Sequence, residues 1–331
     1  MDFCLQPLRF RTDLAVNAKS CVNSNRFYGI GGILMQISGK TKVYGIIGNP
    51  VEHTMSPFIQ GLFAETCGID MVYVPFHVVQ GQLEAALKGA YGLNIQGMNV
   101  TVPYKSAVIP YLTDILDSRA KDIGAVNTLV RDMRDGREGF IGYNTDISGL
   151  WRAMQSDGVF LEDEEVIILG AGGVGRSVAY LCAEHAKHVY LLNRNVAKAE
   201  TVAAEVNSKS GRDGQSCVTA MPLADYKDLL KGAENRYVVL QCTSVGLAPN
   251  VEDVVIDDGD FYHYVKFGYD LIYTPWETTF MKSVTDNGGV AFNGLKMLLY
   301  QGIDAFELWN GCKVTGEAAD KVYQKLCEKV R

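Results

Sequence analysis

The sequence predicts an α/β protein that consists of two successive α/β domains. Its 331 residues exceed what one ordinary domain needs, which favours two. From Val43 onward, short apolar runs alternate with helical stretches, an order typical of a mostly parallel sheet covered by helices. A second block of the same kind begins near Glu165, where four aliphatic residues precede a glycine-rich loop and a helix.

The first block opens with a strand over residues 43–47, which ends in a Gly-Asn-Pro turn. A helix follows at Ser56, which we expect to be its N-cap, with Pro57 at the first helical position. The next elements are a strand, a helix and a strand, over residues 71–76, 82–89 and 95–100. This β-α-β order predicts parallel strands.

The second block opens with a buried strand over residues 166–169, and the glycine loop leads into a helix from about residue 175 to 186. Further strands are predicted at residues 188–192, 237–241 and 269–272. Two amphipathic helices end the chain, over residues 295–309 and 316–329. The periodicity leaves open whether these helices close the second block or return to the first.

The composition excludes several classes of protein. With 47% hydrophobic and 21% charged residues, the chain has the balance of a soluble globular protein. Its net charge of -7 argues against nucleic acid as a partner, and no apolar run is long enough to cross a membrane. The eight cysteines form no C-x-x-C pair and the five histidines show no metal-ligand spacing. We therefore expect no metal site, no disulfide framework and a reducing, cytoplasmic location.

Residues 1–34 lack clear periodicity and contain no continuous apolar stretch of the kind found in secretory signals. We expect this extension to be either a disordered tail or a segment that the native protein lacks. Codons for Gly31 and Gly32 can spell a ribosome-binding sequence just before the codon for Met35. We hypothesise that the native chain begins at Met35, which detection of peptides from residues 1–34 in natively expressed protein would refute.

The glycine-rich loop has the context of a dinucleotide-binding site, because it follows a strand and opens a helix. Its residues are Gly170, Ala171, Gly172, Gly173, Val174 and Gly175. Glycines permit the tight turn and the close approach of backbone to a pyrophosphate, and the helix N-terminus offers N–H groups to the anion. The alternative is a purely structural glycine turn.

The end of the next strand indicates which dinucleotide binds. NAD sites usually carry an acidic residue there for the ribose hydroxyls, but this chain has Asn193, Arg194 and Asn195, followed by Lys198. A guanidinium and an ammonium suit a 2′-phosphate, which favours NADP. The alternative is a solvated basic start of a helix.

Two ionisable residues each follow a short run of small, polar residues. Lys105 ends the run that begins at Asn99, and Asp146 ends the run that begins at Gly142. Alone, Lys105 is an ordinary surface lysine, and Asp146 is an N-cap for a helix that begins near Ile147. Together they form a candidate acid–base pair, because hydride transfer to a ketone requires a proton donor.

Taken together, these motifs show that the chain resembles the shikimate dehydrogenase family over residues 42 to about 311. The matched segments are residues 48–57, 99–105, 124–128, 142–146, 170–175, 193–194 and 293–301. The resemblance implies NADP-dependent, reversible reduction of 3-dehydroshikimate to shikimate, in aromatic amino-acid and chorismate biosynthesis. The implied partners are these small molecules and NADP, for a monomer or homodimer.

The resemblance also implies a domain organisation and residue roles. A substrate-binding catalytic domain spans residues 35–147, a Rossmann-type, doubly wound NADP domain spans 148–289, and C-terminal helices over 290–331 complete the catalytic domain. The implied catalytic pair is Lys105 and Asp146. The residues implied to hold the substrate carboxylate are Thr54, Ser56 and Tyr273, and those for the ring hydroxyls are Thr101, Asn127 and Gln301. The implied cofactor contacts are the loop 170–175, Asn193, Arg194, Lys198, Thr243 and Gly294.

Three departures from the family pattern keep rival functions open. Thr54 replaces the usual Ser, Asn195 and Lys198 replace the usual Thr and Arg, and Gln241 begins a motif that usually starts with Asn. One rival is a quinate/shikimate dehydrogenase that uses NAD. The other is a catalytically silent, ligand-sensing regulator, which the presence of both Lys105 and Asp146 argues against.

Overall fold

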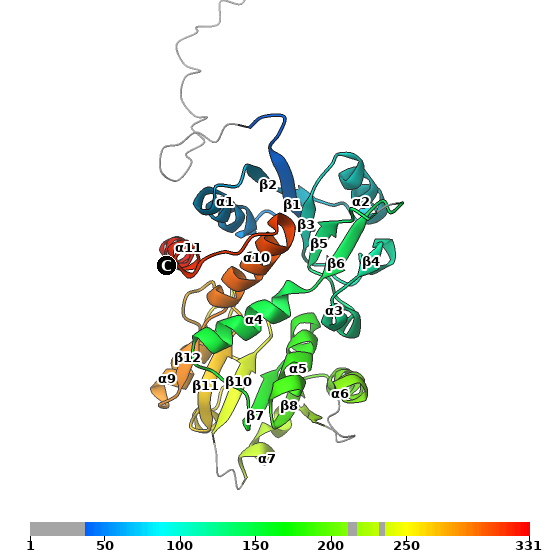
Figure 1. The fold of residues 1–331 in the computed structure, drawn as a ribbon. Coiled ribbons are helices and arrows are strands. Elements are labelled where there is room, and N and C mark those ends of the chain that lie inside the picture. The colour runs from blue at the N-terminus through cyan, green and yellow to red at the C-terminus, as the bar shows by residue number, and fades with distance from the viewer. Residues whose placement is uncertain (1–36, 135, 211–216, 232–235) are drawn as a thin grey trace, which may run out of the picture. The chain divides into compact units, whose positions relative to one another are not determined.

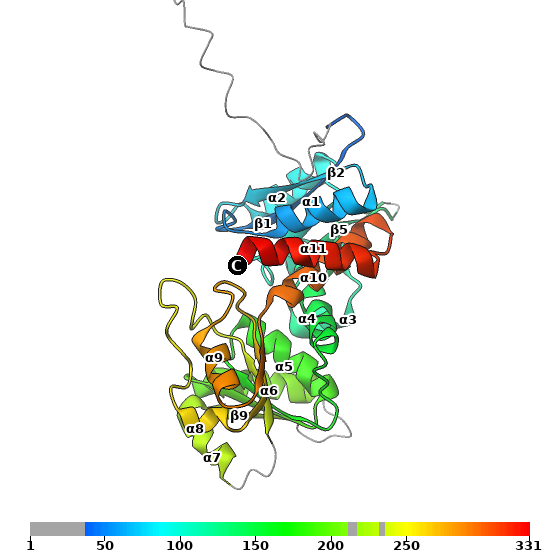
Figure 2. The ribbon, with the colours of Figure 1, turned by 90° about the vertical axis from the view of Figure 1, so that its left-hand side faces the viewer.

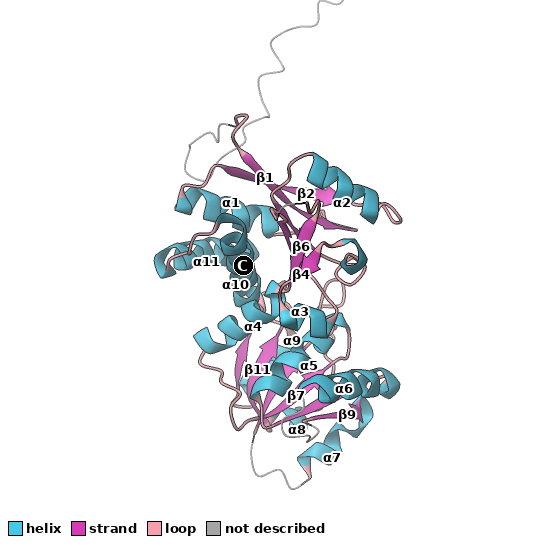
Figure 3. Ribbon diagram, turned by 45° about the vertical axis from the view of Figure 1, so that its right-hand side comes forward, coloured by secondary structure: helices cyan, strands magenta, loops and turns pink. Residues whose placement is uncertain are grey.

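The computed structural model describes residues 37–134, 136–210, 217–231 and 236–331, drawn in colour in Figure 1. Residues 1–34, for which the sequence predicts a tail or a non-native segment, lie outside the described residues. The chain from Thr41 to Arg331 forms one unit, and it contains two six-stranded sheets flanked by helices (Figure 3).

The first sheet has the strand order β2-β1-β3-β5-β6-β4. Its strands are β1 (Lys42–Gly48), β2 (Met71–His77), β3 (Gly97–Val100), β4 (Asp114–Ile115), β5 (Thr128–Arg131) and β6 (Phe140–Tyr143). Its helices are α1 (Ser56–Cys67), α2 (Leu83–Gly92), the 3₁₀ turn η1 (Ile109–Tyr111) and α3 (Ser118–Ile123). The strands β1, β2 and β3 are parallel as expected, whereas β5 is antiparallel to β3 and β6. The segment from β5 to β6 returns as a hairpin, which an antiparallel pair permits.

The second sheet is parallel throughout, with the order β12-β11-β10-β7-β8-β9. Its strands are β7 (Glu165–Leu169), β8 (His188–Asn193), β9 (Val218–Pro222), β10 (Tyr237–Gln241), β11 (Val265–Asp270) and β12 (Val290–Phe292). Its helices are α5 (Gly173–His185), α6 (Val196–Ser210), η3 (Leu223–Asp225), α7 (Tyr226–Leu230), α8 (Gly259–Tyr262) and α9 (Thr279–Asp286). The order reverses between β7 and β10, so this is the doubly wound Rossmann arrangement that the sequence predicts, and ligands bind at such a switch point.

Three further helices complete the fold: α4 (Thr145–Ser156), α10 (Leu295–Asn310) and α11 (Gly316–Val330). Buried side chains of α10 and α11 share one hydrophobic cluster with those of α1, and the Phe63 and Phe306 rings lie 5.6 Å apart. The indole N–H of Trp309 donates to the carbonyl of Leu129 in β5 at 2.9 Å. The C-terminal helices therefore return to the first sheet, beside α1 (Figure 2).

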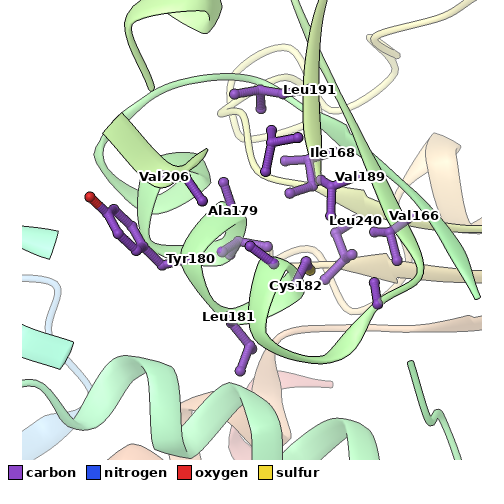
Figure 4. Close-up of a cluster of buried hydrophobic side chains, with 14 of the residues drawn as sticks. Val166, Ile168, Ala179, Tyr180, Leu181, Cys182, Val189, Leu191, Val206 and Leu240 are labelled. Atoms are coloured by element: carbon purple, nitrogen blue, oxygen red, sulfur yellow. The ribbon is translucent and has the colours of Figure 1, made fainter. Parts of the chain in front are cut away.

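The helix α4 contributes to the core of the second sheet. Its Leu150 belongs to the same buried cluster as Leu181 of α5 and the side chains of β7 and β10. Figure 4 shows this cluster, with Ile168 and Leu240 on the strands and Ala179 and Cys182 on the helix. Because α4 is anchored in this core, the position of its first turn is fixed.

Two predicted helix starts are wrong by one or two residues. Helix α1 begins at Ser56 itself, so Met55 and not Ser56 is the N-cap, and it makes no side-chain capping bond. The hydroxyl of Thr54 instead accepts the backbone N–H of Ser56 at 3.2 Å. Helix α5 begins at Gly173, two residues earlier than predicted, with Gly172 as its N-cap.

Candidate active site

A cavity of about 350 Å³ collects side chains from both sequence blocks. It contains every residue assigned from the sequence to substrate binding or catalysis, namely Thr54, Ser56, Thr101, Lys105, Asn127, Asp146, Tyr273 and Gln301. Val174 of the glycine loop also lines this cavity, with 42% of its surface exposed. The predicted acid–base pair and the predicted nucleotide loop therefore meet at one place.

Lys105 and Asp146 form an ion pair, with Nζ 2.7 Å from Oδ2. Their side chains are 31% and 20% exposed, so the pair is partly shielded from water yet reachable from the cavity. The segment after β3 is held in place by a bond from the Val126 N–H to the Lys105 carbonyl, at 2.8 Å. Such a pair can pass a proton to and from an oxygen atom in the cavity.

Asn144 fixes the backbone position of Asp146 at the start of α4. It is the N-cap of α4, and its Oδ1 accepts the N–H groups of Asp146 and Ile147. The alternative that Asp146 is itself an N-cap is therefore wrong. Asp146 lies in the first turn of α4, where its negative charge also meets the positive end of the helix dipole.

One end of the cavity carries hydroxyl groups. The Thr54 hydroxyl donates to Ser56 Oγ at 3.2 Å, and both residues lie at the start of α1. Tyr273 enters from the segment after β11, and burial raises the pKa of its phenol, which therefore stays a neutral hydrogen-bond donor. Neutral hydroxyl donors near a helix start suit an anionic group such as a carboxylate.

A network of buried amides also lines the cavity. Asn127 Oδ1 accepts the Thr145 N–H at 2.7 Å, next to Asp146 in sequence. Asn99 donates to the Asn127 carbonyl at 3.2 Å and accepts from the Tyr73 hydroxyl at 2.6 Å. Asn99 also lines the cavity, although no role was predicted for it from the sequence. Its place at the start of the run that ends in Lys105 was the available signal.

The glycine loop has the geometry that a phosphate cradle needs. Gly170 has a positive φ of 104°, and a Cβ atom at Gly175 would lie 1.9 Å from the Gly170 carbonyl oxygen. A Cβ at Gly172 or Gly173 would have no heavy atom within 4 Å. The first N–H groups of α5 have no partner within the helix, so open space lies in front of anion-binding donors.

Gly170 of this loop also borders a second cavity, of about 500 Å³. It is lined by Gly170, Asn193, Arg194 and Thr243, all of which are predicted from the sequence to bind the cofactor. Three acidic residues with no predicted role also line this cavity, namely Glu252, Asp253 and Asp257.

The predicted cofactor residues differ in how they contribute. Asn193 ties the glycine loop to the next turn, since its Oδ1 accepts the Ala171 N–H at 3.2 Å and its Nδ2 donates to the Asn195 carbonyl at 2.9 Å. Lys198 is exposed and lines neither cavity described above. Gly294 lines the first cavity, beside Lys105 and Asp146, and a Cβ there would lie 2.3 Å from the Leu271 carbonyl oxygen.

Two buried polar residues shape the walls of the cavities. The side chain of Gln241 accepts the Thr243 N–H and donates to the Val245 carbonyl at 3.0 Å, and these bonds shape the turn that borders the second cavity. Asp270 accepts the Ile272 N–H at 3.0 Å and the Thr278 hydroxyl at 2.7 Å, on either side of Tyr273. Its burial raises the pKa of the carboxyl group to about 6.

Within the described part of the chain, no group of three or more His, Cys, Asp or Glu side chains is arranged to hold a metal ion. None of the helices found there combines the length and the apolar character needed to cross a bilayer.

Comparison with protein families gives three matches along the chain. Residues 46–129 match the shikimate dehydrogenase substrate binding domain, and residues 153–245 match the shikimate/quinate 5-dehydrogenase model. Residues 294–314 match the shikimate 5′-dehydrogenase C-terminal domain. The three matches follow the chain in the same order as the first sheet, the second sheet and helix α10.

Individual relatives are similar over most of their length. A shikimate dehydrogenase (NADP(+)) of Methanobrevibacter smithii is 35% identical over 293 residues, which cover 88% of this chain and 99% of the relative. A crystal structure of a shikimate dehydrogenase in complex with NADP+ is 34% identical with a TM-score of 0.79, over 89% of this chain and 98% of that one. A shikimate 5-dehydrogenase of Listeria monocytogenes in complex with shikimate and NAD is 28% identical with a TM-score of 0.79, over 89% and 99%.

Proposed function

The chain belongs to the shikimate dehydrogenase family, and we propose that it catalyses the NADP-dependent, reversible reduction of 3-dehydroshikimate to shikimate. The observation that carries the proposal is the Lys105–Asp146 ion pair, in a cavity that Val174 of the glycine loop also lines. A proton-transfer pair beside a loop suited to a dinucleotide is what the reduction of a ketone needs.

The residues present fit NADP. Open space in front of Gly172 and Gly173 leaves room for a pyrophosphate at the start of α5. Arg194 is exposed and lines the neighbouring cavity, and β8 ends in Asn193 rather than in a carboxylate that would repel a 2′-phosphate. When bound, NADPH supplies the hydride for the carbonyl carbon of the substrate.

Lys105 is the residue we propose for direct proton transfer. During reduction its ammonium donates a proton to the substrate oxygen and stabilises the negative charge that develops there. In the reverse direction its amine takes a proton from the substrate hydroxyl. Asp146, 2.7 Å away, holds the ammonium in place, compensates its charge and accepts a hydrogen bond from the substrate hydroxyl.

The remaining cavity residues would orient the substrate by binding its carboxylate and its ring hydroxyls. We propose that the hydroxyls of Thr54, Ser56 and Tyr273 bind the carboxylate, and that the side chains of Thr101, Asn127 and Gln301 bind the ring hydroxyls. In this proposal residues 35–147 and 290–331 hold the substrate, and residues 148–289 hold NADP. We further propose a cytoplasmic enzyme that acts on small molecules, as a monomer or a homodimer.

Acidic residues near Arg194 favour the alternative function, a quinate/shikimate dehydrogenase that uses NAD. The acidic side chains of Glu252, Asp253 and Asp257 line the same cavity as Arg194. Their negative charge repels a 2′-phosphate and would reduce the difference in affinity between NADP and NAD. Quinate carries one more hydroxyl at the carboxylate-bearing carbon. We therefore expect the residues around Thr54, which would bind the carboxylate, to discriminate between the two substrates.

The experiment that tests the proposal compares initial rates of shikimate and quinate oxidation with NADP+ and with NAD+. We expect shikimate with NADP+ to give the highest kcat/KM. Turnover of quinate at a comparable kcat/KM with NAD+ would support the alternative instead. Binding of shikimate without turnover by either cofactor would refute the proposed activity and support a ligand-sensing protein.

A further inference from the structure

Helices α4 and α10 contact each other at Gly149. A Cβ atom added at Gly149 would lie 2.6 Å from the backbone N, 2.8 Å from the Cβ and 2.9 Å from the Cα of Gln301. All three distances are shorter than a van der Waals contact. Rotation of a side chain cannot relieve them, because two of the three atoms belong to the backbone of α10.

Other contacts prevent α10 from moving away freely. On a different face of α10, a Cβ at Gly302 would lie 3.2 Å from Ile59 of α1. Gln60 of α1 donates to the Gly302 carbonyl at 3.0 Å. Helix α10 is therefore confined by α4 on one face and by α1 on another.

The register between α4 and α10 is fixed by a polar cluster next to Gly149. The hydroxyl of Ser148 and the guanidinium of Arg152 both bind the carboxylate of Asp304. These bonds hold the two helices against sliding, while the absent side chain at Gly149 determines how closely they approach.

The helices that meet at Gly149 carry two residues of the substrate cavity. Asp146 lies one turn before Gly149 on α4, and Gln301 is the residue of α10 that Gly149 touches. The approach of the two helices therefore affects how far apart Asp146 and Gln301 lie in the wall of the cavity.

We propose that Gly149 is a positioning residue, which sets the width of the substrate cavity by allowing Gln301 to approach Asp146. The inference rests on the proposed function, because Gln301 matters only if the ring of the substrate lies between these side chains. Gly149 touches no substrate atom in this account, and it acts through the backbone of Gln301.

The test is Gly149→Ala, assayed with shikimate and NADP+. Moving the Gln301 backbone from 2.6 Å to van der Waals contact displaces it by about 1 Å, and a misplacement of that size costs on the order of 10² in catalytic efficiency. We expect a loss of about that size in kcat/KM for shikimate, with a raised KM. The dissociation constant for NADP+, measured by titration without substrate, should stay at the wild-type value.

Two glycines provide matched controls. Gly61 in α1 and Gly89 in α2 also lie within helices, and a Cβ at either would have no heavy atom within 4 Å. Gly61→Ala and Gly89→Ala should therefore keep the wild-type kinetics and a Tm at or above that of the wild type.

A double-mutant cycle separates positioning from a structural role. If Gly149 acts through Gln301, then Gly149→Ala should cost much less kcat/KM in a Gln301→Ala background than in the wild type. Equal costs in both backgrounds, or a wild-type kcat/KM for Gly149→Ala, would overturn the inference. A wild-type protein that does not oxidise shikimate would instead refute the proposed function.

A second variant decides the matter if Gly149→Ala does not fold. Gln301→Ala keeps Gly149 and removes the side chain through which Gly149 is proposed to act. We expect a raised KM for shikimate and an unchanged NADP+ dissociation constant for this variant. Unchanged shikimate kinetics for Gln301→Ala would overturn the inference, because Gly149 would then have no cavity side chain to position.

Discussion

Replacement of Asp270 by Asn should change how stability depends on pH. Asp270 is fully buried at the end of β11, where its carboxyl group accepts hydrogen bonds from the Ile272 N–H and the Thr278 hydroxyl. Burial raises the pKa of this carboxyl group from 3.8 to about 6, against the opposing effect of two hydrogen bonds. The native state therefore holds a proton on Asp270 at pH values where the unfolded chain has released it.

The sign and size of the effect follow from this difference. Between the two pKa values the native state binds more protons, so stability falls as pH rises, and the loss is complete above the folded pKa. A rise from 3.8 to about 6 corresponds to about 3 kcal/mol in total. Of this, about 2 kcal/mol is lost between about pH 4.5 and about pH 8.

The Asn side chain does not titrate, but it has the same shape as Asp and can keep both hydrogen bonds. Its Oδ1 can accept the Ile272 N–H, and its Nδ2 can donate to the Thr278 hydroxyl oxygen. Relative to the wild type, Asp270→Asn should therefore gain about 2 kcal/mol in the free energy of unfolding between about pH 4.5 and about pH 8.

Urea unfolding of both proteins at the two pH values measures this gain. Other titrating groups contribute equally to both proteins, so they cancel in the difference. Unfolding free energies that change in parallel with pH would refute the reasoning, because Asp270 would then titrate as it does in the unfolded chain.

Two further predictions concern cofactor and substrate choice. Arg194→Ala should weaken NADP+ binding about tenfold to a hundredfold more than NAD+ binding, since a charge-assisted contact contributes about 1.5–3 kcal/mol. Titration with both cofactors checks this, and equal losses would show that Arg194 does not meet the 2′-phosphate. Shikimate should have a higher kcat/KM than quinate, because the methyl group of Thr54 narrows the carboxylate end and an unpaired hydroxyl there costs about 1–3 kcal/mol. Thr54→Ser should narrow that difference, and an unchanged ratio would exclude Thr54 as its source.

The sequence allowed the second sheet to be predicted more fully than the first. The aliphatic run at 166–169 and the glycine loop identify β7 and α5, because buried parallel strands are nearly continuous apolar runs. The strands β4, β5 and β6 were not predicted. They are two to four residues long, too short for a periodic pattern, and the antiparallel pairing of β5 depends on tertiary contacts.

The members of the substrate cavity could be predicted because they stand in recognisable runs. What could not be predicted is how the chain supports them. The bonds that the Tyr73 hydroxyl donates to Asn99 and that Gln60 donates to Gly302 join residues 26 and 242 positions apart, and no local pattern signals such contacts. Gly149 is similar, since a glycine within a helix pattern signals only reduced helix propensity until its neighbour is known.

The most direct test of the central claim is the rate of shikimate oxidation by Lys105→Ala and Asp146→Asn at saturating NADP+. Each variant should lower kcat by about 10²–10⁴, as expected for the loss of a positioned acid–base group. The double variant should be little worse than the worse single one, because the two groups act as a unit. Lys88→Ala, which removes an exposed lysine that is paired with Glu84, provides the matched control and should keep the wild-type kcat. A Lys105→Ala enzyme with the wild-type kcat and only a raised KM would contradict the account, since Lys105 would then bind the substrate without transferring a proton.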